Sequence, residues 1–133
     1  YYKFSGETTL SYFGIPVTCE LEIGGDIAAD LSVVVTHVET SGSNTCDNSI
    51  TFNNLPWDGQ GDSSAMTLDI YDVDVTVAGF FGCSGDVTAP FNNGSPASAP
   101  SYFTLASVSL GSCNLNGTLT VDPVASDYPD INI

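Results

Sequence analysis

Closely spaced aspartates are the residues of this sequence best suited to polar chemistry. Asp58 and Asp62 flank a Gly-Gln-Gly segment, and Asp69, Asp72 and Asp74 follow on a stretch with strand character. Calcium takes several carboxylate and carbonyl oxygens from flexible loops, so these five residues form a candidate cation site. Neither set matches an EF-hand or a nonapeptide calcium repeat. The favoured interpretation is therefore that they are solvated acids on a turn and an outer face, and that the protein has no cofactor.

The groups that catalysis needs are sparse. His37 is the only histidine, and a Ser-His-Asp triad would require it in a pocket beside a nucleophile elbow, which nothing near it resembles. We expect His37 to be an ordinary sheet residue. Paired carboxylates alone could serve a glycosidase, but such sites lie among aromatic side chains in a cleft, and Trp57 falls in a predicted connecting loop. We expect that the protein is not an enzyme.

Charge excludes several partners. Sixteen acidic residues face one lysine and no arginine, for a formal net charge of −15. Without basic side chains the chain cannot neutralise phosphates, so nucleic acid and anionic membranes are excluded as partners. No apolar run approaches the ~20 residues of a membrane-spanning helix. Scarcity of tryptic sites suits an exposed extracellular protein, and simple solubility by self-repulsion explains the charge equally well.

Four cysteines in a short acidic chain indicate two disulfides in an oxidising compartment. Zinc is the rival interpretation, but the chain has no C-x-x-C pair and a single histidine. We therefore expect a secreted protein, extracellular or at the cell surface.

Strand periodicity is clearest in the segment 113–121, whose odd positions are apolar apart from one glycine and whose even positions are polar. Short Val-, Ile-, Thr- and aromatic-rich segments separated by Gly and Pro continue along the chain, and no helical spacing is sustained. The expected fold is all-β: a single antiparallel β-sandwich or barrel-like domain over residues 1–133.

Two similar halves, about 15–54 and 79–122, each run in the order cysteine, strand, turn, long strand, cysteine. Four cysteines allow three pairings, and equivalence of the halves selects Cys19 with Cys46 and Cys83 with Cys113. The flanking segments 1–13 and 123–133 are predicted to be tails able to pair with a neighbour.

Four local features are expected between the cysteines. A change of apolar phase near Ile70-Tyr71 predicts a β-bulge. Gly24-Gly25-Asp26 predicts a turn, and the segment 53–62 predicts a turn-rich connection between the halves. The strand 31–38 has apolar residues on both faces, which predicts a central position.

Three motifs resemble a known family: Leu55-Pro56-Trp57, Phe81-Gly82-Cys83-Ser84-Gly85-Asp86-Val87, and Gly111-Ser112-Cys113-Asn114-Leu115-Asn116-Gly117-Thr118-Leu119-Thr120-Val121. Together they resemble the PraB-like secreted bacterial proteins, described as activators of alkane oxidation, over residues 5–121. The resemblance implies a small exported β-protein with disulfides, associated with the cell surface, biofilm or hydrocarbon growth. It implies no catalytic residue.

Two functions follow as hypotheses. The first is a self-assembling structural protein, a filament or biofilm-matrix subunit whose partner is another copy of itself. Strand addition through the termini would then use the apolar residues Tyr1, Tyr2, Phe4, Ile131 and Ile133. The second is a soluble secreted module that binds or emulsifies hydrocarbons or binds glycans. Its contacts would be exposed aromatic side chains, of which the candidates are Tyr1, Tyr2, Phe13, Phe80 and Phe81.

Overall fold

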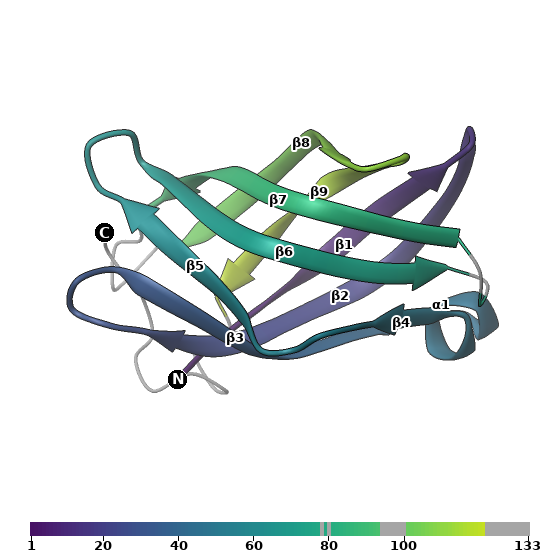
Figure 1. Ribbon diagram of the computed structural model, residues 1–133, viewed down its shortest axis with the longest axis horizontal. Helices are drawn as coiled ribbons and strands as arrows, with labels where there is room; N and C mark the ends of the chain where they lie inside the picture. The colour runs from purple at the N-terminus through teal and green to yellow at the C-terminus, as the bar shows by residue number, and fades with distance from the viewer. Residues whose placement is uncertain (78, 80, 94–100, 122–133) are drawn as a thin grey trace.

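The computed structural model describes residues 1–77, 79, 81–93 and 101–121. The all-β prediction is confirmed (Figure 1). The strands are β1 (Tyr2–Tyr12), β2 (Ile15–Ile27), β3 (Ser32–Ser41), β4 (Ile50–Phe52), β5 (Trp57–Asp62), β6 (Thr67–Val77), β7 (Phe81–Asn92), β8 (Tyr102–Leu110) and β9 (Cys113–Val121), with one short helix, α1 (Asn44–Asn48). Among the described residues, no helix is long or apolar enough to cross a membrane.

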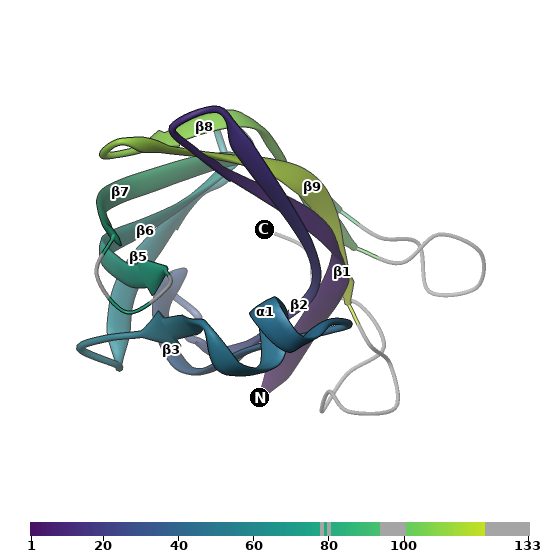
Figure 2. The same cartoon turned by 90° about the vertical axis from the view of Figure 1, so that its right-hand side faces the viewer.

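The strands close into an antiparallel barrel. Their order is β4-β6-β5-β3-β2-β1-β9-β8-β7, and an additional pairing between β6 and β7 joins the two sides. β4 and β5 both pair with the edge of β6 opposite β7, at different places along it, so β4 extends the wall that β5 forms in the ring of eight. Figure 2 shows the ring end on, with α1 at the near end. Closure pairs the strand edges that an open sheet would expose.

Alternation of side chains fills the barrel with apolar groups. Phe103, Leu110 and Leu119 on β8 and β9 are fully buried. Phe4 on β1 contacts the ring of Phe103, with ring centroids 5.2 Å apart, and meets Phe91 edge-on. The Cys113–Val121 strand therefore contributes one face to the interior, as its pattern predicts.

The predicted bulge in β6 is confirmed. The register with β7 shifts between Ile70 and Val73, so Leu68 and Ile70 before it and Val73, Val75 and Val77 after it all face inward. Asp72 has a φ of 53°, and its backbone N–H donates to Asp86 Oδ1 at 3.0 Å. The pairing of β8 with β9 contains the same device, since Ser107 has a φ of 49° and donates to Asn116 Oδ1 at 2.7 Å.

The predicted turn at Gly24-Gly25-Asp26 is wrong. These residues continue β2, and the turn follows at 28–31. β3 bulges at Thr36 opposite the glycine pair, and a Cβ on Gly25 would overlap the Val34 carbonyl, so only glycine permits this approach of the strands. The bulge also turns Val38 inward, which explains why β3 is apolar at both parities.

The predicted connection over 53–62 is wrong in its second part, which forms β5. Trp57 is buried instead of lying in a loop, and its indole N–H donates to the Asn53 carbonyl at 2.8 Å. A Cβ on Gly59 would overlap the Asp69 carbonyl of β6, so only glycine permits this approach of β5 to β6. These glycines therefore serve a close strand approach and not a turn.

Both predicted disulfides are present. Cys19–Cys46 and Cys83–Cys113 have Cα separations of 5.8 and 5.7 Å. The predicted repeat aligns β2 with β7 and β3 with β8, and it stays a prediction. The second cysteines of the two halves differ in setting, since Cys46 lies in α1 and Cys113 begins β9. Ser43 caps α1 by accepting the Cys46 N–H at 3.2 Å.

Candidate functional site

The barrel encloses an apolar cavity of about 70 Å³. Inward side chains of strands on opposite sides of the ring line it, among them Leu10 on β1 and Leu21 on β2, opposite Val73 on β6 and Ala89 on β7. A second cavity, of about 30 Å³, lies beyond Leu68, Ile70 and Phe103, which border both. The interior therefore holds two neighbouring apolar cavities.

The polar groups beside the larger cavity are already bonded within the chain. The Thr40 hydroxyl donates to the Cys46 carbonyl at 2.8 Å, and the Thr8 hydroxyl lies 3.5 Å from the Gly6 carbonyl. The indole N–H of Trp57 donates to the Asn53 carbonyl. No described side chain has a buried N or O atom without a hydrogen-bond partner. The cavity thus offers an occupant dispersion contacts but no hydrogen bonds.

Between β3 and β4 the wall of the cavity lacks backbone pairing. β3 pairs with β5 through Ser32–Val35 only, and β4 pairs with β6, so no backbone ladder joins the end of β3 to β4. Val38 and Thr40 on one side and Ile50 and Phe52 on the other are half-buried lining residues. We refer to this place as the β3–β4 opening.

The predicted cation residues are distributed over the outer wall. Asp58, Asp72 and Asp74 border a hollow of about 490 Å³, whereas Asp62 and Asp69 do not line it. Asp74 accepts hydrogen bonds from Asn53 and Asn54, Asp62 from the backbone of Ser64 and Ala65, and Asp69 from Thr88. Within the described residues, these carboxylates do not form a group of three ligand atoms at coordination distance. Calcium binding stays a prediction.

His37 is a strand residue, as predicted, and lies on the outer face of β3. It is not isolated, because Glu22 and Glu39 approach its ring. The sequence does not indicate this cluster, since it depends on the register between two strands.

The predicted assembly residues have different surroundings. β1 pairs along both edges, with β2 and with β9, and Phe4 is buried in the barrel. Tyr1 is 38% exposed. Donating this segment to a neighbour would first break its own pairing, and its role in assembly stays a prediction. Ile131, Ile133 and Phe80 lie outside the described residues.

Among the side chains that the structure describes, the most exposed large apolar ones are instead at the β1–β2 hairpin. Phe13 is 68% exposed and Ile15 is 53% exposed. Phe13 and Gly14 make the tight turn with φ values of 47° and 77°. Of the proposed hydrocarbon contacts whose side chains the structure describes, Tyr1, Tyr2 and Phe13, the last has the greatest exposed fraction.

A family model described as "Alkane oxidation protein activator PraA/PraB-like" matches residues 2–128. Searches of curated proteins and of solved structures found no match. The matched range includes all nine strands and both disulfides, and it confirms the resemblance carried by the three sequence motifs.

Proposed function

Since the chain belongs to the alkane oxidation protein activator PraA/PraB-like family, we propose that it is an extracellular, non-enzymatic protein that takes up hydrocarbon chains inside its barrel. The observation that carries the proposal is the apolar cavity with its β3–β4 opening. Activation of alkane oxidation would then consist of bringing a sparingly soluble substrate to the cell.

The size of the cavity sets how much of a chain it holds. An apolar cavity of about 150 Å³ stays dry and accepts benzene, so about 70 Å³ accommodates a chain end of a few carbon atoms. Burial of three carbons contributes roughly 2–3 kcal/mol, which gives weak and readily reversible binding. The remainder of a longer alkane would lie along the opening, against Val38 and Phe52.

The chemistry of the wall favours an alkane over a glycan. A glycan site needs polar groups aimed at the ligand, whereas the hydroxyls of Thr8 and Thr40 lie against backbone carbonyls. An apolar ligand leaves no such group unsatisfied. Secretion is supported by the two disulfides, which persist in oxidising compartments.

Trp57 provides a direct test, because it is the only tryptophan and it lines the cavity. Titration with n-octane should change its fluorescence emission in a saturable way. Ala89→Leu, which fills the cavity, should abolish the change. Ala106→Leu makes the same substitution at an exposed position of β8 and should retain it. Equal responses of the two variants, or no saturable response of the native protein, would contradict the proposal.

We propose self-assembly into an extracellular filament or matrix as the second candidate, favoured by the exposed apolar tip at Phe13 and Ile15. A tip that inserts into a different surface of the next copy makes a contact that does not close, and such contacts build fibres. Negative-stain microscopy should show uniform filaments that Phe13→Ser removes and Tyr71→Ser, a matched change at another exposed aromatic, preserves. A monodisperse monomer at high protein concentration, in high salt and with a divalent cation present, would refute this candidate.

A further inference from the structure

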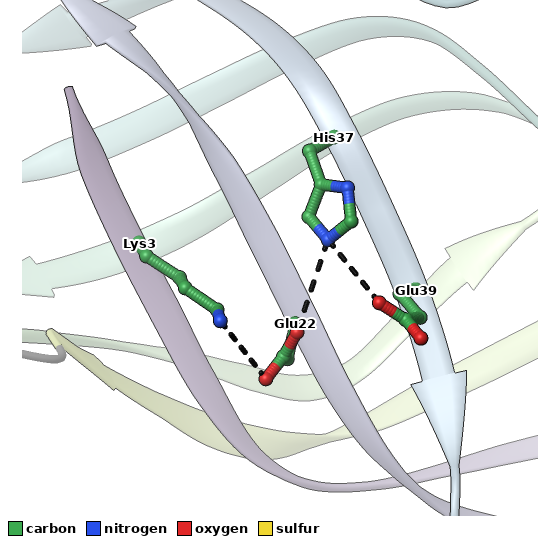
Figure 3. A network of polar contacts seen from close by, with 4 residues as sticks. All are labelled: Lys3, Glu22, His37 and Glu39. Atoms are coloured by element: carbon green, nitrogen blue, oxygen red, sulfur yellow. Dashed lines mark ion pairs between the residues drawn. The ribbon is translucent and has the colours of Figure 1, made fainter. Parts of the chain in front are cut away.

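Glu22, His37 and Glu39 converge on the outer wall of the barrel (Figure 3). Glu22 on β2 lies directly opposite Glu39 on β3 in the strand register, and His37 lies opposite Gly24. Gly24 contributes no side chain beside the imidazole, and the Tyr1 side chain occupies the place that a Gly24 Cβ would take. After the bulge at Thr36, His37 and Glu39 both point outward, two residues apart on one strand.

The ligand atoms are close to coordination spacing. His37 Nε2 lies 3.5 Å from Glu39 Oε2 and 3.8 Å from Glu22 Oε2, and the three ligand atoms lie within 4.8 Å of one another. Tetrahedral zinc with nitrogen and oxygen ligands sets neighbouring ligand atoms about 3.4 Å apart. The two nitrogen–oxygen distances therefore need only small adjustments, and the half-exposed glutamates can rotate to bring their oxygens together.

We propose that Glu22, His37 and Glu39 form a binding site for a zinc-class divalent cation. Imidazole nitrogen suits zinc, nickel, copper and cobalt, whereas calcium and magnesium take oxygen ligands almost exclusively. Three protein ligands leave at least one coordination position for water.

The charges around the cluster support this assignment. Two carboxylates directly opposite each other on neighbouring strands repel, and a bound dication removes that repulsion. Lys3, the only lysine, contacts Glu22 Oε1 at 3.2 Å. This contact holds one oxygen of Glu22 and leaves the other, Oε2, facing His37 (Figure 3). The lysine thus positions a ligand without occupying the space between the three.

The site would fasten a part of β3 that has backbone pairing on one side only. His37 and Glu39 alternate with Val38 and Thr40, which line the β3–β4 opening. A cation bridging β2 and β3 would therefore fix the rim of the opening from outside. Binding of the cation does not depend on whether the barrel takes up hydrocarbon.

The test is a zinc titration of the full chain, monitored by calorimetry and by NMR of the imidazole nitrogens of His37. We expect one equivalent to bind with a large shift of the His37 signals, and a rise in Tm that grows with free zinc. His37→Gln and Glu39→Gln should each weaken binding by about tenfold or more. Loss of a residue that only orients a metal ligand typically lowers metal affinity by about tenfold or more, and loss of the ligand itself should cost at least as much. Asp58→Asn removes the same charge at an exposed acid of β5 and should leave affinity unchanged.

Two results would overturn the proposal. Equal weakening by Asp58→Asn and Glu39→Gln would mean that zinc responds only to the overall negative charge. Unshifted His37 resonances at one equivalent of zinc would mean that the cluster is only a set of ion pairs. Circular dichroism of each variant confirms folding, which the exposed positions of His37 and Glu39 lead us to expect: their side chains are 43% and 61% exposed.

Discussion

Replacing Ala89 by leucine should stabilise the barrel, because the added atoms enter space that is now empty. Ala89 is 2% exposed and lines the cavity of about 70 Å³. Leucine adds three carbons, whose burial contributes about 0.8 kcal/mol each, or roughly 2.4 kcal/mol in total. Ordering the longer side chain costs about 0.5–1 kcal/mol, which leaves a gain of roughly 1.5 kcal/mol in the free energy of unfolding. For a chain of this length that corresponds to a rise in Tm of about 5 °C.

The assay is urea and thermal unfolding, followed by circular dichroism and by Trp57 fluorescence. Ala106→Leu serves as the control, because the same atoms are added at an exposed site, where changes stay within about 0.5 kcal/mol. Overpacking of a full interior typically costs about 1–3 kcal/mol. A loss of that size in Ala89→Leu would show that the barrel has no free space at this point, and it would remove the basis for hydrocarbon uptake as well.

Three further predictions concern the frame of the barrel. Replacing Cys19 and Cys46 by serine should lower the free energy of unfolding by about 3–4 kcal/mol, measured in urea, since the bridge closes a loop of 27 residues; a loss under about 1 kcal/mol would contradict the loop-entropy argument. Asn116→Ala should cost about 0.5–1.5 kcal/mol and speed hydrogen exchange at the bulge of β8, because a backbone N–H loses its acceptor. The side-chain and backbone hydrogen bonds from Ser32 lower the pKa of Asp30 below its ordinary 3.8, so Ser32→Ala should raise that pKa in an NMR titration. Because the pKa of Asp30 is lower in the folded state, its ionised carboxylate stabilises the folded protein at pH values above the ordinary 3.8. The difference in free energy of unfolding between native and variant protein should therefore be present at neutral pH and vanish as the pH falls below 3.8.

The bulges show what strand pattern can and cannot reveal. The bulge in β6 was predictable because inward residues on both sides of it, Ile70 and Val73, are large and apolar, so the phase change is visible in the sequence. The bulge in β3 was not, because Val34 is apolar and yet faces outward, 38% exposed. An apolar residue on the outer wall removes the contrast from which a phase change is inferred.

Glycine was misread for a related physical reason. In β2 and β5 the glycines permit a neighbouring backbone to come close, as at Gly25 and Gly59. That requirement arises from a strand that is distant in the sequence, whereas the turn-forming property of glycine is local. A single sequence therefore favours the turn, and only the assembled barrel distinguishes the two uses.

The cavity and the Glu22–His37–Glu39 cluster were beyond prediction because both depend on non-local register. Glu22 and Glu39 are seventeen positions apart and become neighbours only through the pairing of β2 with β3. The pairing of the cysteines was accessible because it rested on comparison of the halves and not on register. The local difference between them is α1, which begins after the cap at Ser43 and takes the place of a strand at Cys46. The five residues of α1 are too few to show a helical pattern in the sequence.

The distribution of charge separates the two candidate functions. The chain has a net charge of −15, and the interior of its barrel is apolar. Copies of the protein therefore repel one another at low ionic strength, while each retains an apolar space inside. A carrier of hydrocarbon needs this combination, because loaded molecules must stay dispersed. A filament needs subunits that attract one another, so its subunits could meet only when cations screen or bridge the acidic side chains. Assembly through Phe13 should therefore require high salt or a divalent cation, whereas octane uptake should proceed without either, because the occupant of the cavity carries no charge.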